Sequence, residues 1–234
     1  MTDTPRYAIY YAAAPGSALD RFGAGLLGHD ASSGEALPFP DGIEQAIADW
    51  REITGDPSKY GFHATLKAPM TLADGKTEAE LLAACESFAR SPRAIPEIKP
   101  VVNEIGDFIA VVPSQRSAEL EQLAADAVSA FDEFRTPLTP ADRARRNPGR
   151  LTPRQRDYLD HWGYPYVMEE YRFHMTLTGR LPDDRRKTVL AELRRRFATI
   201  ELESLVIDAI AVFMQPDAKS KFSIVQRYEL TKKS

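Results

Sequence analysis

The sequence has almost no cysteine: Cys85 is the single one in 234 residues. One cysteine cannot form an internal disulfide, so the chain lacks the cross-links that are usual in small secreted proteins. Leu81, Leu82 and Phe88 lie at helical spacing from it, which favours a small buried core residue over a reactive nucleophile.

Long apolar runs are missing as well. No stretch approaches the roughly 20 apolar residues that a membrane-spanning helix needs, and residues 1–6 lack the apolar segment of a signal peptide. We therefore expect a cytoplasmic protein with no membrane partner.

A surplus of basic residues is also absent. The 30 Lys and Arg residues are outnumbered by 34 Asp and Glu residues, which gives a net charge of -4 and a pI of about 5.7. Proteins that bind an extended nucleic-acid backbone usually carry a basic surplus, so extended nucleic-acid binding is disfavoured and only a local basic patch remains open. With 43% hydrophobic and 27% charged residues, the composition is that of a globular protein.

The pattern of apolar residues repeats in two series. In each series a strand is followed by a helix and then by two strands. Outside the two series we expect a strand at 7–13, helices at 43–53 and 117–134, and an irregular insertion at 135–170. The first series covers 60–70, 77–90, 98–105 and 108–112, and the second covers 172–181, 185–197, 201–214 and 222–230. Two copies, rather than many, predict an α+β fold of two related lobes with pseudo-two-fold symmetry.

The two series share a short motif. Tyr60–Leu66 reads YGFHATL and Tyr171–Leu177 reads YRFHMTL, so five of the seven positions agree. The histidines, His63 and His174, are two of only four in the chain and lie 111 residues apart. Chance is a poor explanation for this match.

Strand geometry gives each motif a polar face, because side chains on a strand alternate between its two sides. The polar faces combine imidazoles, hydroxyls and cations: His63, Thr65 and Lys67 on the first strand, and His174, Thr176 and Thr178 on the second, flanked by Arg172 and Arg180. The other faces are apolar and are expected in the core: Phe62, Ala64, Leu66, Phe173, Met175 and Leu177.

Two imidazoles in one cleft suit acid–base chemistry on a phosphodiester. One neutral histidine takes a proton from water or a hydroxyl, and one protonated histidine gives a proton to the leaving alkoxide. Thr65 and Thr176 can hydrogen-bond the non-bridging oxygens, and Lys67 and Arg172 can balance their charge.

Two other interpretations of the motifs stay open. Each histidine alone could be a hydrogen-bonded structural residue, although the duplicated frame favours catalysis. A zinc site needs three or four ligands, often with Cys or acidic residues, and neither motif offers a carboxylate on its polar face. We therefore expect no metal and no cofactor.

The insertion at 135–170 is rich in arginine at its start. Residues 135–156 contain one opposing Asp142 and seven arginines: Arg135, Arg143, Arg145, Arg146, Arg150, Arg154 and Arg156. This run fits a lid over a phosphorylated ligand as well as it fits a solvated surface segment.

The paired His-x-Thr-Leu strands resemble the 2H phosphoesterase superfamily, which includes 2′-5′ RNA ligase-like proteins and cyclic nucleotide phosphodiesterases. The longer phrases Tyr60–Met70 and Trp162–Arg180 are similar to a branch associated with bacterial phosphonate metabolism. The resemblance implies a bilobal fold with two antiparallel sheets backed by helices around a central cleft. It also implies that His63 and His174 are the acid–base pair, that Thr65 and Thr176 bind phosphate, and that no cofactor takes part.

Three functions are compatible with these features. The first is hydrolysis of a small cyclic phosphate, such as a ribosyl 1,2-cyclic phosphate. The second is RNA end processing at 2′,3′-cyclic or 2′-5′ linkages, and the third is a non-catalytic nucleotide- or RNA-binding module. The acidic pI favours the small phosphorylated substrate, with Lys67, Thr178, Arg172 and the 143–156 run as candidates for holding its phosphates.

Overall fold

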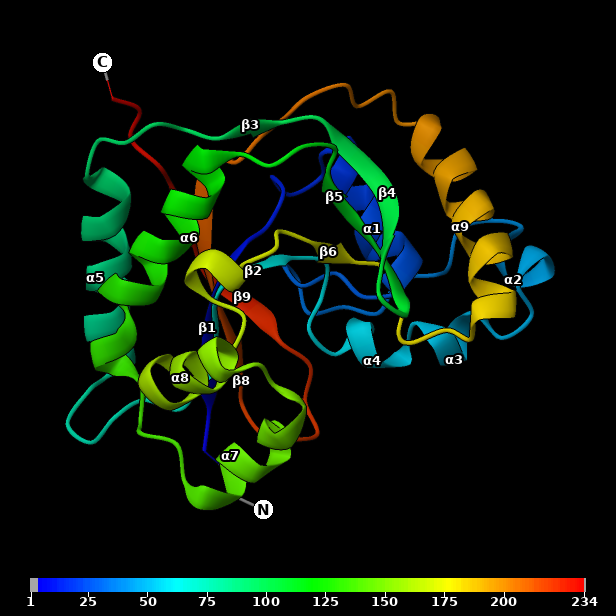
Figure 1. The fold of residues 1–234 in the computed structure, drawn as a ribbon. Coiled ribbons are helices and arrows are strands. Elements are labelled where there is room, and N and C mark those ends of the chain that lie inside the picture. Colours follow the sequence, from blue (N-terminus) through cyan, green and yellow to red (C-terminus); the bar gives the residue numbers. More distant parts are fainter. Residues whose placement is uncertain (1–3, 234) are drawn as a thin grey trace.

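The computed structural model describes residues 4–233 (Figure 1). Its main sheet has seven strands in the order β4-β5-β6-β2-β1-β8-β9, and every neighbouring pair is antiparallel. The strands are β1 (Arg6–Tyr11), β2 (Ala64–Met70), β4 (Pro100–Ile105), β5 (Phe108–Pro113), β6 (Met175–Thr176), β8 (Ala209–Gln215) and β9 (Ser223–Glu229). A small second sheet pairs β3 (Glu97–Ile98) with β7 (Leu205–Val206).

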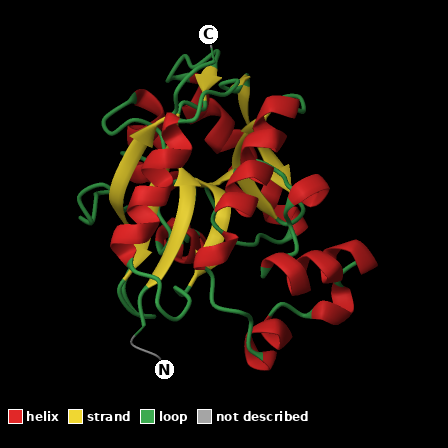
Figure 2. Ribbon diagram, turned by 90° about the vertical axis from the view of Figure 1, so that its left-hand side faces the viewer, coloured by secondary structure: helices red, strands yellow, loops and turns green. Residues whose placement is uncertain are grey.

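Helices pack around this twisted layer of strands (Figure 2). They are α1 (Ala18–Leu27), α2 (Ile43–Ala46), α3 (Trp50–Ile53), α4 (Gly55–Ser58), α5 (Glu78–Arg90), α6 (Ala118–Ala130), α7 (Pro140–Arg145), α8 (Pro153–Trp162) and α9 (Asp183–Ala198). Short 3₁₀ turns lie at Asp132–Phe134, Pro148–Arg150 and Met168–Glu170. The expected α+β class is confirmed, and none of the helices in residues 4–233 is long and apolar enough to cross a membrane.

The two series of the sequence exchange elements in space. Helix α5 follows the first motif strand but packs on β8 and β9 of the second series, and α9 follows the second motif strand but packs on β4 and β5 of the first. One lobe therefore combines β1 and β2 with β8 and β9, and the other combines β6 with β4 and β5.

The two expected sheets are joined into one at the motif strands. Strands β2 and β6 meet in one registered pair, Ala64 opposite Met175, and both side chains are fully buried. The apolar faces of the motifs thus pack in the core, as their alternation predicts, and the junction lies at the centre of the molecule.

The insertion at 135–170 is not irregular, so this expectation was wrong. It forms α7 and α8, and each helix starts with a capping box, Thr139 with Asp142 and Thr152 with Gln155. Pro140 and Pro153 look like loop signals in the sequence, but they occupy the first turn of these helices, where a missing N–H costs nothing.

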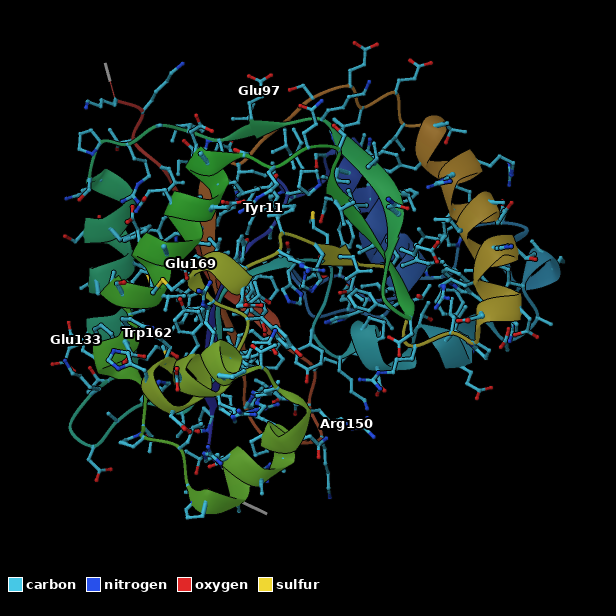
Figure 3. The ribbon with its side chains drawn as sticks, in the orientation of Figure 1. Tyr11, Glu97, Glu133, Arg150, Trp162 and Glu169 are labelled. Carbon is cyan, nitrogen blue, oxygen red and sulfur yellow. The ribbon has the colours of Figure 1, made fainter. Side chains whose placement is uncertain are left out.

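A buried ion pair ties the segment just before the insertion to the first motif strand. The Lys67 ammonium lies 2.6 Å from the Asp132 carboxylate and donates a second hydrogen bond to the Val128 carbonyl at 3.1 Å. Only 3% of the Lys67 side chain is exposed. The same ammonium lies 5.9 Å from the ring centre of Trp162 at the end of α8 (Figure 3).

Asp132 also holds Arg135, whose Nε donates to it at 2.9 Å. From there the Arg135 guanidinium donates to the His161 carbonyl at 3.0 Å. One carboxylate therefore connects β2 with the C-terminal end of α8.

Replacing Lys67 by Met should destabilise the protein by about 3 kcal/mol, because removing one partner leaves the Asp132 charge poorly compensated. We place the loss at the lower end for such pairs because Arg135 remains. Urea denaturation measures it. The control Lys59→Met removes an exposed pair with Asp56 and should leave stability nearly unchanged, so equal losses in both variants would contradict a structural role for Lys67.

Candidate active site

The strand junction sets the arrangement of the four motif side chains. In an antiparallel ladder, the residues that flank a registered pair face each other on the same side of the sheet. Since Ala64 lies opposite Met175, His63 lies beside Thr176 and Thr65 lies beside His174. Each histidine is thus next to the threonine of the other motif.

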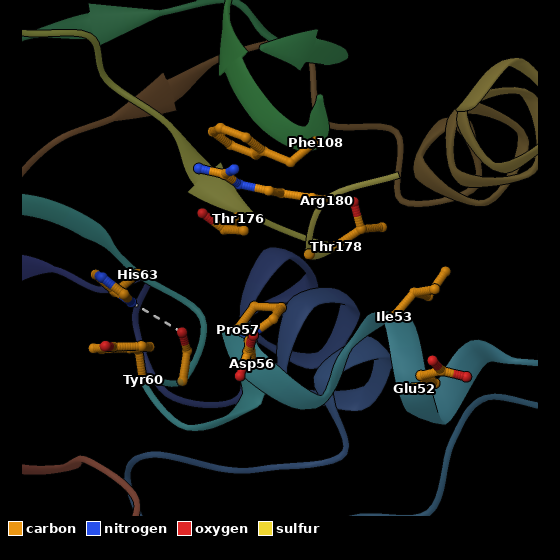
Figure 4. A pocket seen from close by; sticks show the side chains of 12 residues that line it. Glu52, Ile53, Asp56, Pro57, Tyr60, His63, Phe108, Thr176, Thr178 and Arg180 are labelled. Atoms are coloured by element: carbon orange, nitrogen blue, oxygen red, sulfur yellow. Dashed lines mark hydrogen bonds between the residues drawn. The ribbon is translucent and has the colours of Figure 1, made fainter. Parts of the chain in front are cut away.

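Two cavities border this cross-paired set. The first, of about 520 Å³, is lined by His63 and Thr176, and the second, of about 510 Å³, is lined by His174 and Thr65. Phe108 and Arg180 line both. In the close view of the first cavity, the Arg180 side chain runs between Phe108 and Thr176 (Figure 4).

The two histidines are held by the same local hydrogen bond. Nδ1 of His63 contacts the Gly61 carbonyl at 2.9 Å, and Nδ1 of His174 contacts the Arg172 carbonyl at 2.7 Å. A carbonyl can only accept, so each Nδ1 carries a proton. Nε2 of His174 has no hydrogen-bond partner among residues 4–233, whereas Nε2 of His63 lies 3.4 Å from the Thr65 hydroxyl of its own strand. A neutral ring then offers Nε2 as a base, and a charged ring offers it as an acid.

Gly61 is needed for the first of these bonds. Its φ is +73°, in the left-handed region, and a Cβ there would lie 2.8 Å from the Ala31 Cβ. The matching residue of the second motif is Arg172, whose φ is not positive. The two copies therefore reach the same histidine contact by different backbone routes.

Burial favours the neutral form of both rings. His63 stacks on Tyr10, with ring centres 3.7 Å apart. Burial, opposed by the Gly61 hydrogen bond and aided by the charge of His174, lowers the pKa of His63 to about 4. Burial also lowers the pKa of His174. A bound phosphate anion would favour protonation of one ring, so binding would create the acid–base pair.

Lys67 does not share the face of His63 and Thr65, contrary to the expectation from strict alternation. Strand β1 pairs Tyr10 with Thr65 but Ile9 with Lys67, so β2 carries one extra residue between them. Such a bulge turns the following side chain to the other side. Lys67 lines neither cavity and points to Asp132 instead.

The other two candidate substrate-binding residues have different positions. Arg172 is exposed and lines the second cavity, and its carbonyl also orients His174. Thr178 borders the first cavity but none of its surface is exposed. Its hydroxyl accepts a hydrogen bond from the Ile109 N–H at 3.1 Å. Thr178 therefore holds the segment after β6 against β5 and does not reach a ligand.

Arg180 and Phe108 border both cavities, although the sequence placed only Arg180 beside the polar face and assigned neither residue to the site. A signal for Arg180 existed, because it continues the even-numbered polar face of His174 and Thr176. It is exposed and lies 3.5 Å from Asp107 in the turn before β5. Phe108 had no such signal, because its position depends on how the β4–β5 hairpin meets β6.

Most arginines of the insertion are bound within it. Arg143 makes two hydrogen bonds to Asp160 at 2.6 and 2.9 Å, Arg145 pairs with Asp142, and Arg156 donates to the Leu151 carbonyl at 2.7 Å. The insertion reaches the second cavity through other side chains: Gln155, Tyr164, Tyr166, Val167 and Glu170.

Metal ligands are not grouped in the described structure. Among residues 4–233 there is no cluster of three or more His, Cys, Asp or Glu side chains that could hold an ion. His29, a third histidine, is buried, and its Nε2 lies 3.0 Å from the Phe222 carbonyl.

The chain belongs to the family described as DUF1045, a protein family of unknown function, which matches residues 65–223. The match includes Thr65 and the whole second motif and begins two residues after His63. Among curated proteins, it is similar to two named ribose 1,5-bisphosphate phosphokinase PhnN. Identity is 35% over 213 residues in Janthinobacterium sp. (strain Marseille) and 31% over 220 residues in Laribacter hongkongensis (strain HLHK9).

These alignments cover 88% and 94% of this chain but 47% and 50% of the two relatives. The chain therefore spans about half the length of the curated relatives that it matches. Whatever the other half of each relative does is not carried by the aligned residues.

Solved structures with a similar fold include Escherichia coli LigT complexed with NADP+, at a TM-score of 0.43 and 11% identity, covering 99% of this chain and 100% of that one. A conserved protein of unknown function from Agrobacterium tumefaciens str. C58 has a TM-score of 0.42 and 12% identity, with 95% and 85% covered.

The lowered pKa of His63 predicts a loss of stability in acid. Between its ordinary pKa of 6.5 and its lowered value of about 4, the unfolded chain binds a proton that the folded chain does not, so stability rises with pH. We expect the free energy of unfolding to fall as the pH is lowered from about 6.5 to 4, and His63→Gln to lose part of that decrease.

Urea denaturation at stepped pH measures this effect. The control His161→Gln changes an exposed histidine and should keep the wild-type dependence. A His63→Gln variant whose stability follows pH as the wild type does would contradict a His63 that stays neutral in the folded protein.

Proposed function

We propose that this protein is a metal-independent phosphodiesterase that hydrolyses a small cyclic phosphate ester by two-histidine acid–base catalysis. The observation that carries the proposal is the cross-paired set at the β2–β6 junction. Two histidines whose Nδ1 atoms are held by backbone carbonyls border two cavities that share Phe108 and Arg180, and each lies beside the threonine of the other strand.

The reaction follows from this arrangement. One Nε2 removes a proton from water as its oxygen bonds to phosphorus, and the Nε2–H of the other histidine gives its proton to the ester oxygen as the bond from phosphorus breaks. The hydroxyls of Thr65 and Thr176 hydrogen-bond the non-bridging oxygens. Arg180, exposed and bordering both cavities, adds positive charge to the same oxygens.

For the substrate we propose a ribosyl 1,2-cyclic phosphate that carries a phosphate on O5. The resemblance of Tyr60–Met70 and Trp162–Arg180 to the phosphonate-associated branch supports this choice, and so does the printed name of the curated relatives. Breaking the bond between phosphorus and O2 leaves one phosphate on O1 and one on O5. The product, ribose 1,5-bisphosphate, is the compound in that name.

The kinase activity in the relatives' name is not part of the proposal. A nucleotide-binding P-loop needs the spacing G-x-x-x-x-G-K-[ST]. The chain has one Gly-Lys-Thr, at Gly75-Lys76-Thr77, and Met70 stands where the first glycine would be.

A second candidate is a nucleoside 2′,3′-cyclic phosphate, as at an RNA end. The second cavity favours it, because Phe108, Tyr164 and Tyr166 line the space next to His174 and aromatic rings stack on bases. The net charge of -4 disfavours the extended RNA contact that a longer strand would make.

His63→Ala and His174→Ala should each lower kcat by about 10²–10⁴-fold, since each removes one proton-transfer group. Steady-state hydrolysis of the ribosyl cyclic phosphate and of nucleoside 2′,3′-cyclic phosphates measures the loss. The control His161→Ala should retain activity. Wild-type kcat in either motif variant would rule out the two-histidine mechanism.

Exhaustive chelation should leave the rate unchanged, because protonated nitrogen, hydroxyl and guanidinium groups supply all the charge balance in this mechanism. The measurement compares kcat before and after dialysis against EDTA, with added Zn²⁺ or Mn²⁺ as the reciprocal test. Loss of activity that either ion restores would move the protein to the metal-dependent phosphoesterases.

A further inference from the structure

The first cavity is unfavourable for an anionic ligand. Two carboxylates, those of Glu52 and Asp56, lie in its wall, and both residues are exposed (Figure 4). Arg180 also lines this cavity, but its guanidinium lies 3.5 Å from the Asp107 carboxylate. Carboxylates repel a phosphorylated sugar but not water. The walls of the first cavity therefore suit the small, uncharged reactant of a hydrolysis.

The second cavity offers apolar surface for a sugar ring. Much of its wall is aromatic and comes from four side chains: Phe108, Tyr164, Tyr166 and Tyr171. The rings of Tyr164 and Tyr166 meet edge to face, with their centres 5.6 Å apart. Ligand pockets typically combine such aromatic surface with a few polar groups that fix orientation, and the faces of the rings can cover the C–H groups of a sugar.

The charges in the second cavity are balanced. Arg172 and Arg180 line it together with Asp107 and Glu170. Glu170 accepts a hydrogen bond from the Gln155 amide at 2.9 Å, and Asp107 faces Arg180. Arg172 is exposed and makes no ion pair within residues 4–233. An anionic group on the sugar is therefore tolerated here, whereas the first cavity repels it.

The cross-pairing puts the two cavities at opposite ends of the reacting position. His63 and Thr176 border the first cavity, and Thr65 and His174 border the second. Along the strands, these two pairs flank the registered pair at the junction. A phosphorus atom held between the two threonine hydroxyls thus has one histidine and one cavity on each side. Displacement at phosphorus has the same requirement, because the attacking and departing oxygens lie roughly in line.

We propose that the second cavity holds the sugar of the cyclic ester and that water attacks from the first cavity, so that His174 is the acid and His63 is the base. This assignment rests on the proposed function and extends it. The sugar carries the departing oxygen, and the Nε2–H of His174 gives its proton to that oxygen as the bond from phosphorus breaks. On the other side, Nε2 of His63 takes a proton from the water whose oxygen bonds to phosphorus.

The contacts of His63 fit the role of a base. Its Nδ1 carries a proton, so in the neutral ring Nε2 accepts, and the Thr65 hydroxyl lies 3.4 Å from that nitrogen. Burial in the first place, and the charge of His174 in addition, lower the pKa of His63 to about 4 against the opposing Gly61 hydrogen bond. A proton on His174 therefore keeps His63 neutral.

Two cyclic esters test the roles: the ribosyl 1,2-cyclic phosphate and its analogue with sulfur in place of O2, the departing atom. A thiolate is a much weaker base than an alkoxide, so it leaves without a proton. His174→Ala should lower the single-turnover rate for the oxygen ester about 10²–10⁴-fold and should cost the sulfur ester only a small part of that loss. His63→Ala should slow both esters alike, because both need an attacking water.

The outcomes separate the roles from the reaction. If His174→Ala loses the same factor on both esters, or if sulfur rescues His63→Ala instead, the roles are wrong and the proposed function stands. If the wild type cleaves neither ester, the proposed function fails and the roles fail with it. The placement of the sugar is then decided by binding alone.

Ribose 5-phosphate probes that placement without a reaction, by titration calorimetry. Tyr164→Leu, in the second cavity, should weaken its binding roughly 10-fold. The matched variant Tyr60→Leu, in the first cavity, should bind it as the wild type does. No binding to the wild type, unchanged binding in Tyr164→Leu, or an equal loss in Tyr60→Leu would overturn the sugar subsite.

Discussion

One backbone pairing, Ala64 with Met175, determines the rest of the site. Strand β6 has only two residues, and a single residue pair sets its register with β2. No other pair between these strands would oppose a shift by one residue. Period-two alternation means that such a slip would turn the motif histidine of one strand to the core. The full burial of Ala64 and Met175 makes that slip costly, because it would replace two apolar side chains by an imidazole and a hydroxyl.

The sequence predicts the faces of the motif strands well and their pairing not at all. Alternation correctly puts Phe62, Ala64 and Met175 in the core, because it depends only on local strand geometry. The neighbours His63–Thr176 and Thr65–His174 depend on the register between segments 111 residues apart, and no local pattern encodes that register.

Two errors have local causes, and the sequence hides only the first of them. The extra residue between Thr65 and Lys67 shows only in the pairing with β1, so alternation gave Lys67 the wrong face. In the insertion, Pro140 and Pro153 look like signs of a loop, but a proline is also common in the first turn of a helix. The capping partners Asp142 and Gln155 distinguish the two cases, and the Thr-x-x-Asp and Thr-x-x-Gln spacings were visible in the sequence.

The exchange of helices between the two series has a consequence for the order in which the chain can fold during synthesis. Helix α5 rests on β8 and β9, which leave the ribosome after the other described strands, and strand β1 needs β8 as its neighbour. About half of the first lobe's sheet is thus missing until residues 209–229 emerge. Until then β1, with its row of apolar and aromatic side chains, presents an unpaired edge that can join strands of other chains. The lobe that carries His63 is therefore completed only when β8 and β9 have been made, and until then the earlier strands depend on whatever shields them.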